Sequence, residues 1–289
     1  MTLAISDISV RPPFDFRHTL DFVQSFPPCA RDFVISGDSV IGALGIGDRG
    51  VGFRIRAAGA SLALELEGAA SGEDTREAAR LCALFVSADD DLADFYARAA
   101  GDAAPYRALV ERLRGLHHVR FLTLAEITCY AVIMQRTPIH LAAAQKAKLA
   151  HALGPRARFG AHELVAFPSF DELARAREED FAAILRHPEK ARRMVAAIDG
   201  VASLGEAWLR AAPYDDAFAA LTAIRGIGPF SARAILLRGL GRMDQLDPNG
   251  PVFARAARAV YGPRWSAADT LDRYAHTIGY WSYYLRVGA

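Results

Sequence analysis

One segment, Leu221–Ile235, limits the possible folds of this chain more than any other. Apolar residues at helical spacing stand on both sides of a Gly-Ile-Gly-Pro turn, in which Gly226 and Gly228 let the backbone bend tightly and approach a ligand closely. Pro229 fits the first turn of a following helix, where its missing N–H costs nothing. The pattern predicts two helices joined by a hairpin, with free backbone N–H groups at a helix N-terminus.

Such a hairpin suits an anion such as a DNA phosphate, because unpaired N–H groups and the positive end of a helix point outward together. The alternative interpretation is a glycine-rich helix corner without a ligand. The candidate DNA-binding residues of this segment are Gly226, Ile227, Gly228, Phe230 and Ser231, with Gly226 and Gly228 as the phosphate anchors.

The remaining chain divides into two parts by its hydrophobic pattern. Residues 1–105 combine helical stretches with short apolar runs separated by turn signals, and the runs that read as strands are 33–35, 39–41, 51–56 and 61–66. From Tyr106 onward the pattern is almost entirely helical. We therefore predict an α+β fold. An N-terminal sheet-containing domain covers 1–105, and a helical core of two lobes covers 106–289, with the hairpin at about 215–240.

A glycine pattern at Gly45–Gly50 formally matches the dinucleotide-binding fingerprint, Gly-x-Gly-x-x-Gly. That fingerprint must open a helix after a strand. Here it is followed by Val51–Arg56, which reads as a strand. We therefore interpret these glycines as a hairpin turn between two strands.

Charge is distributed unevenly along the chain. Residues 1–105 hold nine arginines and 16 acidic residues, whereas 106–289 hold 25 basic and 17 acidic residues. A basic second part joined to an acidic first part favours a polyanion partner for the second part. The alternative is chance variation of the surface.

Other features of the sequence exclude several classes of protein. There is no run of 18 apolar residues, and the N-terminus lacks the basic-then-apolar pattern of a signal peptide. Cys29, Cys82 and Cys129 are too few and too scattered for a disulfide framework or a four-cysteine metal site. We expect a cytoplasmic protein, of bacterial type, without a membrane segment or a metal ion.

The segment 221–244 resembles the helix-hairpin-helix DNA glycosylase superfamily, in particular its 3-methyladenine DNA glycosylase II branch, whose members excise alkylated bases. Similar stretches occur over nearly the whole chain, at Pro12–Phe16, Glu126, Gln135, Lys190–Arg192, Arg273–Tyr274 and Tyr280–Tyr283. The resemblance implies an N-terminal domain like one half of the TATA-binding protein and an active site in a cleft between two helical domains. It also implies duplex DNA with damaged bases as the partner and no cofactor or metal. We expect a monomer.

The sequence departs from that branch at the catalytic aspartate, since Gly250 stands at the matching position. A nearby stretch, Leu246-Asp247-Pro248-Asn249, resembles the one that holds the catalytic aspartate in the adenine-glycosylase branch. One preorganised carboxylate can stabilise the cationic sugar that forms when the N-glycosidic bond breaks. Asp247 is therefore the candidate catalytic residue, and the alternative is that it caps the next helix.

The resemblance implies a base pocket as well. Its candidate residues are Gln135, Phe230 and Trp281, with Phe230 in place of a larger stacking ring. Arg136 stands where an apolar wedge would fill the space left by an extruded base, and an arginine there would add a phosphate contact. We count it among the DNA-binding candidates.

Two functions remain open on these grounds. The first is a monofunctional DNA N-glycosylase that flips and excises alkylated or otherwise damaged bases. The second is a DNA-binding or lesion-recognition protein that has lost catalysis. The last lysine of the chain is Lys190, so no lysine beside the hairpin provides a Schiff base for a lyase step.

Overall fold

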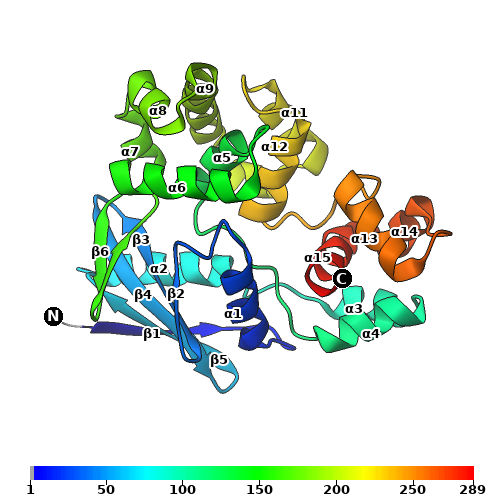
Figure 1. Ribbon diagram of the computed structural model, residues 1–289. Coiled ribbons are helices and arrows are strands. Elements are labelled where there is room, and N and C mark those ends of the chain that lie inside the picture. Colours follow the sequence, from blue (N-terminus) through cyan, green and yellow to red (C-terminus); the bar gives the residue numbers. More distant parts are fainter. Residues whose placement is uncertain (1–2) are drawn as a thin grey trace.

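The computed structural model describes residues 3–289, and it has an antiparallel five-stranded sheet at one end and helices over the remainder (Figure 1). The strand order is β1-β5-β4-β3-β2. The strands are β1 (Leu3–Ser9), β2 (Val34–Ser36), β3 (Ser39–Ile46), β4 (Arg49–Ala58) and β5 (Ser61–Glu67). The predicted α+β class is confirmed, and β1 is a strand that the sequence pattern did not indicate.

The Gly45–Gly50 pattern is the turn of a β-hairpin. Ile46 pairs with Arg49 across β3 and β4, and Gly47 has a φ of 60°, which a glycine adopts without strain. No helix begins at this point, so the glycines do not form a dinucleotide-binding loop.

Apolar residues on β3 alternate between the two faces of the sheet. Val40 and Leu44 belong to a large core on one face, where α1 (Phe16–Ser25) and α2 (Gly72–Phe85) contribute buried residues. Ile41 and Ala43 point to the other face, where they pack with Phe159, Leu164 and Ala166. Both faces are therefore covered.

The second face is covered by a small hairpin of two strands, β6 (Arg156–Phe159) and β7 (His162–Val165). The expectation that residues 106–289 are almost entirely helical is wrong here. The two strands have four residues each and are joined at Gly160, which has a φ of 57°. They are too short to show a clear alternation of apolar and polar residues among the helical segments on either side. A Cβ at Gly50 or Gly52 would collide with the backbone of Arg156 or Arg158, so β4 needs glycine for this contact.

Helices make up the rest of the chain, and none of those described is long and apolar enough to cross a membrane. They are α3 (Ala93–Ala100), α4 (Ala104–Arg112), α5 (Leu124–Ile133), α6 (Ile139–Leu153), α7 (Phe170–Ala174), α8 (Glu178–Leu185), α9 (Pro188–Leu204), α10 (Glu206–Ala211), α11 (Tyr214–Ala223), α12 (Pro229–Ala234), α13 (Pro251–Tyr261), α14 (Ala267–Tyr274) and α15 (Ile278–Gly288). A π-helical turn, Ile235–Gly239, extends α12, and a 3-10 turn, Ala275–Thr277, joins α14 to α15.

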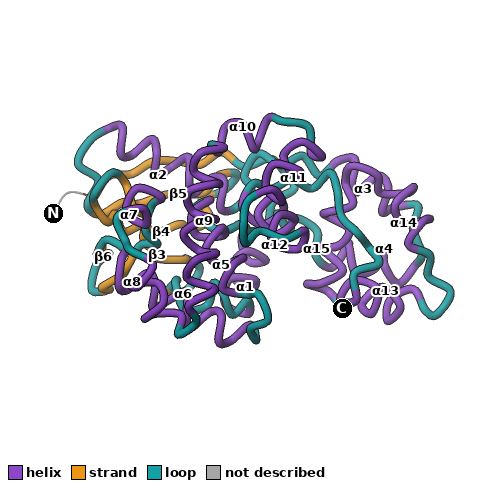
Figure 2. The backbone as a smooth tube through the Cα atoms, turned by 90° about the horizontal axis from the view of Figure 1, so that it is seen from above, coloured by secondary structure: helices purple, strands orange, loops and turns teal. Residues whose placement is uncertain are grey.

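Two large apolar cores organise these elements. The first joins the sheet and α1–α4 to α13–α15, and the second lies within α5–α12. In the view from above, α3, α4, α13 and α14 gather at one end and the strands at the other (Figure 2). The domain boundary at residue 105 stays a prediction, because the first core includes residues from both sides of it.

Candidate DNA-binding hairpin and base cavity

The hairpin predicted at 215–240 is formed by α11, the turn Ile224–Gly228 and α12. Gly226 has a φ of 93°, and a Cβ there would lie 2.6 Å from the Cβ of Arg193 on α9. Gly228 is the N-cap of α12 and has open space where a Cβ would stand. The two glycines therefore have different roles: the first permits the bend, and the second leaves the end of α12 accessible.

Three neighbouring residues hold the turn from inside. The Gln135 amide donates to the Gly226 carbonyl oxygen at 2.6 Å and to the Ser231 hydroxyl at 3.3 Å. That hydroxyl donates in turn to the Ala131 carbonyl on α5 at 3.2 Å, and Ile227 is buried. Ile227 and Ser231 thus support the hairpin instead of facing a ligand. We also correct the prediction for Gln135, which braces the turn and does not line a cavity.

The outer side of the hairpin has unpaired donors. Within the described chain, the backbone N–H groups of Gly226 and Gly228 have no protein acceptor. Arg225 beside them is exposed. This combination of N–H groups, a helix N-terminus and a cation can bind an anion.

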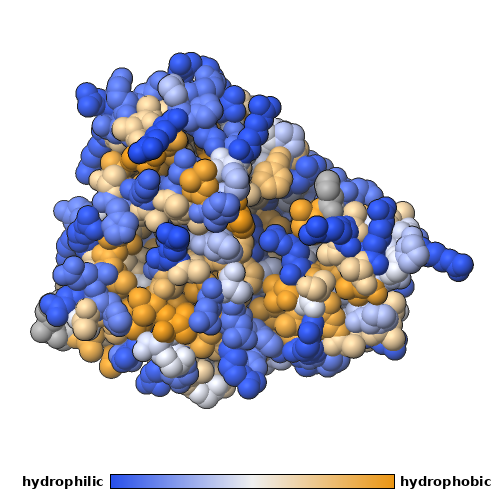
Figure 3. Space-filling view, in the orientation of Figure 1, coloured by the Kyte–Doolittle hydropathy of each residue, from blue (hydrophilic) through white to orange (hydrophobic). Residues whose placement is uncertain are grey.

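A cavity of about 360 Å³ lies next to the hairpin, where the two apolar cores meet. Its wall is mostly aliphatic and aromatic, and it includes Phe26, Phe121, Tyr130, Met134, Phe230 and Leu237. Phe230 is 66% exposed, so its ring stands at the open side. Apolar side chains gather in the recess between the helices α12 and α13 in the space-filling view (Figure 3). A cavity of this size and lining is suited to one flat aromatic group.

Asp247 and Gly250 both line this cavity, so the two positions considered for the catalytic carboxylate lie at the same site. Asp247 is exposed, and its carboxylate accepts from the backbone N–H of Asn249 at 2.9 Å. Gly250 is the N-cap of α13, and a Cβ there would be 3.3 Å from the Phe253 ring. Asp247 thus caps the turn before α13 and not the helix itself.

Arg136 lies in the connection between α5 and α6. It is exposed, and its φ of 52° is unusual for a residue with a side chain. Met134 and Ile139 on either side of it line the cavity. The side chain therefore starts from the edge of the cavity.

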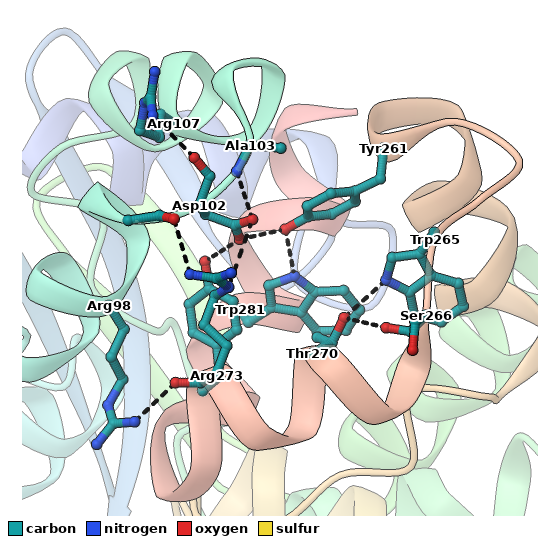
Figure 4. A network of polar contacts seen from close by, with 12 residues as sticks. Arg98, Asp102, Ala103, Arg107, Tyr261, Trp265, Ser266, Thr270, Arg273 and Trp281 are labelled. Carbon is teal, nitrogen blue, oxygen red and sulfur yellow. Dashed lines mark hydrogen bonds and ion pairs between the residues drawn. The ribbon is translucent and has the colours of Figure 1, made fainter.

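Trp281 lies elsewhere, and the prediction that it belongs to the base pocket needs correction. It is 0% exposed and does not line the cavity. Its indole N–H donates to the Tyr261 hydroxyl at 2.9 Å, and its ring stacks on Trp265 with 6.2 Å between centroids (Figure 4). The Tyr261 hydroxyl donates to the Asp102 carboxylate at 2.8 Å. This buried network fastens α15 to α3, α4 and α13.

Arg238, on the inner wall of the cavity, is a residue that sequence reasoning missed. It is only 9% exposed, and its guanidinium lies over the rings of Phe22 and Phe26. One nitrogen donates to Nε2 of His118 at 3.3 Å. Burial lowers the pKa of Arg238, and burial together with the neighbouring Arg238 and Arg120 holds the pKa of His118 well below its usual range. His118 is therefore neutral and accepts this hydrogen bond.

A second buried charged cluster is centred on Lys146. The Lys146 ammonium donates to the carboxylates of Glu126 and Asp32. Burial alone would lower the pKa of Lys146, but the two carboxylates outweigh it and raise that pKa. Glu126 is thus an internal ion-pair partner. Over residues 3–289, no group of three or more histidine, cysteine or acidic side chains could hold a metal ion.

Comparisons with known proteins agree with this architecture. No protein-family model matches the chain. The chain is 28% identical over 154 residues to a DNA-3-methyladenine glycosylase from Bacillus subtilis (strain 168), an alignment that covers 53% of this chain and 50% of that relative. The chain thus spans about half of the length of this curated relative.

Solved structures share the fold over nearly the whole length. A 3-methyladenine DNA glycosylase from Archaeoglobus fulgidus superposes with a TM-score of 0.79 at 19% identity, covering 97% of this chain and 96% of that one. An 8-oxoguanine glycosylase/lyase from Clostridium acetobutylicum, solved with duplex DNA containing cytosine opposite 8-oxoguanine, gives 0.71 at 16% identity, with coverages of 95% and 91%. The chain therefore shares the fold of these DNA glycosylases. It resembles the 3-methyladenine DNA glycosylases in both sequence and structure, and the resemblance seen in the sequence is confirmed.

Proposed function

We propose that this protein is a monofunctional DNA N-glycosylase that extrudes a damaged base from duplex DNA and releases it. The observation that carries the proposal is the position of the hairpin directly beside the apolar cavity. The hairpin N–H groups bind a backbone phosphate, which fixes the duplex without reading its sequence. The nucleotide next to that phosphate turns out of the helix, and its base enters the cavity.

The cavity supplies stacking for the extruded base. Phe230, Phe26 and Phe121 provide aromatic faces in its wall. Arg136 at the edge fills the space that the base leaves and contacts a phosphate. Stacking of the base on several rings offsets part of the free energy needed to unpair it from the duplex.

Asp247 supplies the negative charge for bond cleavage. It is the one carboxylate among the described residues that line the cavity. When the glycosidic bond breaks, positive charge develops on the sugar, and a fixed carboxylate nearby lowers the energy of that state. Bound DNA removes water from around Asp247 and so strengthens the interaction.

The lysines of the chain do not support a lyase step, since none of the three lines the cavity. Lys190 is buried and donates to the Ile133 carbonyl and the Thr137 hydroxyl, and Lys146 is held by two carboxylates. A Schiff base needs a free amine at the sugar.

The direct test is base release from duplexes that carry one 3-methyladenine, hypoxanthine or etheno-adenine. Free base and an intact abasic strand are the expected products. The second candidate function, lesion binding without excision, is favoured by Gly250 at the usual aspartate position and by the exposure of Asp247. Tight binding to these duplexes without any released base would select it.

A further inference from the structure

A buried ion pair joins the sheet-containing part of the chain to the helices beside the cavity. Lys146 on α6 is 1% exposed, and its ammonium donates to the carboxylates of Asp32 and Glu126. Glu126 lies on α5, whereas Asp32 belongs to the turn 26–33 between α1 and β2. The Lys146–Asp32 pair therefore fastens this turn to α6.

Both members of the pair are charged at neutral pH. Burial raises the pKa of Asp32 to about 6, although Lys146 opposes this effect, so the carboxylate is ionised above that pH. A buried ion pair adds little to stability on balance, because the cost of removing two charges from water offsets much of their attraction. The position that this pair fixes is the better explanation for it.

The turn that carries Asp32 also carries part of the cavity wall. Phe26 begins this turn, lines the cavity and is partly buried. The backbone N–H groups of Cys29 and Ala30 donate to the Phe26 carbonyl oxygen at 2.8 and 3.0 Å. The N–H of Asp32 donates in turn to the Cys29 carbonyl oxygen at 2.9 Å. The turn is thus one hydrogen-bonded unit, in which the position of Asp32 affects the position of Phe26.

Lys146 also contacts a second ring of the same wall. Its ammonium lies 5.2 Å from the centroid of the Phe121 ring, and both Phe121 and Phe26 line the cavity. Lys146 itself does not line it. One buried cation is therefore linked to two aromatic rings of the wall, to Phe121 by direct contact and to Phe26 through Asp32.

We propose that the Lys146–Asp32 ion pair is a positioning pair, which holds the Phe26 ring in the wall of the base cavity. The proposal rests on the function proposed above and names residues that act on the extruded base through another residue. A ring that is already fixed stacks on a base without being ordered first, which favours binding. Without the pair, the turn separates from α6 and the base loses one stacking partner, while the phosphate contacts of the hairpin remain.

Cys29 reports on the turn without any DNA. It is 2% exposed, and burial raises the pKa of its thiol to about 12, so it is unreactive while the turn is docked. In Asp32→Ala we expect a thiol reagent to label Cys29 about tenfold faster than in the parent, because the turn opens locally. Cys82 on α2 and Cys129 on α5 are also buried and should keep their parent rates, as measured by mass spectrometry of the same sample.

The second measurement is equilibrium binding to two duplexes of one sequence, carrying etheno-adenine or an abasic analogue. The parent is expected to bind the etheno-adenine duplex about tenfold tighter, because the base stacks in the cavity. Asp32→Ala should bring this ratio close to one and leave the affinity for the abasic duplex unchanged. Asp32→Asn keeps an acceptor without the charge and should be intermediate in both measurements, which preserves the test if the Ala variant does not fold.

Asp90→Ala is the matched control. The Asp90 and Asp32 side chains are 19% and 23% exposed, and each pairs with a buried cation, which is Arg120 in the case of Asp90. Neither Asp90 nor Arg120 lines the cavity. The control should also lower stability, but Cys29 labelling and the binding ratio should stay as in the parent. If it reduces the ratio as much as Asp32→Ala does, the cause is a general loss of stability and the positioning role is wrong.

Two further outcomes would overturn the proposal. One is unchanged Cys29 labelling in Asp32→Ala, since the pair would then not hold the turn. The other is faster labelling with an unchanged binding ratio, since the turn would then open without moving the wall.

The same experiments separate this proposal from the function on which it depends. A parent that binds both duplexes equally would contradict the entry of a base, and Cys29 labelling would still decide whether the pair holds the turn. A parent that prefers the etheno-adenine duplex but releases no base would contradict the catalytic function and leave the positioning role in place.

Discussion

The side-chain amide of Gln135 is bonded to the backbone of Gly226, with 2.6 Å between the Gln135 amide nitrogen and the Gly226 carbonyl oxygen. The amide oxygen of Gln135 accepts from Arg193 at 3.2 Å, so one side chain joins α5, α9 and the hairpin turn. The turn is therefore held in shape by contacts within the protein itself.

Removing this brace should weaken both the fold and DNA binding. Gln135→Ala is expected to lower the free energy of unfolding by about 1 to 2 kcal/mol, because Gly226, Ser231 and Arg193 each lose a hydrogen bond. Affinity for duplexes should also fall, since the turn loses its fixed shape. Urea unfolding and anisotropy titration measure the two effects. Gln24→Ala on the exposed face of α1 is the control, and equal behaviour of the two variants would show that the brace is unimportant.

Gly228→Glu should block the proposed phosphate site without disturbing the fold. A side chain at this position meets no atom within 4 Å, so it fits, and it adds a negative charge at the end of α12. We expect affinity to fall by about tenfold for all sequences and lesions alike. Gly228→Gln, which has the same shape without the charge, should bind more tightly than Gly228→Glu. If Gly228→Glu binds duplexes like the parent, the hairpin is not the DNA anchor.

Asp247→Asn tests the source of the catalytic charge. Base release should fall by on the order of 10²-fold or more, as when one preorganised electrostatic group is removed. DNA affinity should stay the same or rise, because a negative charge near the phosphates is gone. Single-turnover release and binding are measured on the same duplex.

The reciprocal variant, Gly250→Asp, puts a carboxylate on the same cavity wall. In a parent without activity, a gain of base release would show that the rest of the site is intact. An active parent whose rate is unaffected by Asp247→Asn would contradict the catalytic assignment of Asp247.

The neutral His118 makes stability depend on pH. Its pKa in the folded protein is held well below 6.5, first by burial and then by Arg238 and Arg120, whereas the unfolded chain takes up a proton near pH 6.5. Between these two pKa values the unfolded state binds more protons, so stability falls as the pH falls below about 6.5, by up to about 1.4 kcal/mol per pH unit. Urea midpoints from pH 7 to 4.5 should fall less steeply in His118→Gln. The exposed His140→Gln on α6 should follow the parent, and identical slopes in all three proteins would contradict the account.

The features that sequence alone predicted correctly are local ones. Three of them depend on residues within a few positions of each other. They are the turn at Gly226 and Gly228, the β-hairpin turn after Ile46 and the start of α12 at Pro229. The resemblance to the DNA glycosylases rests on this same turn at Gly226 and Gly228. Local backbone chemistry therefore carried most of the correct fold assignment.

Side chains whose roles depend on distant elements were assigned less well. Trp281 lies on a helix whose residues 278–285 are all buried, so nothing in its periodicity told which side faces the cavity. Gln135 turns toward Gly226 in the hairpin turn, 91 residues away, and its direction depends on that turn. The sequence indicated Arg238 only as a single charge within the apolar stretch Leu236-Leu237-Arg238-Gly239. The cavity that Arg238 lines is formed by four separate parts of the chain, so the sequence pattern did not place Arg238 in it.

The glycines of β4 have an effect far beyond their own strand. The backbone of β6 rests against Gly50 and Gly52, and the chain after β7 continues into α7, which packs on α9. Arg193 of α9 is the residue against which Gly226 turns. A methyl group added at Gly50 or Gly52 would collide with the backbone of β6, and the resulting shift would be passed on toward the hairpin through α7 and α9. The sheet, which holds no candidate site residue, thus takes part in positioning the hairpin turn.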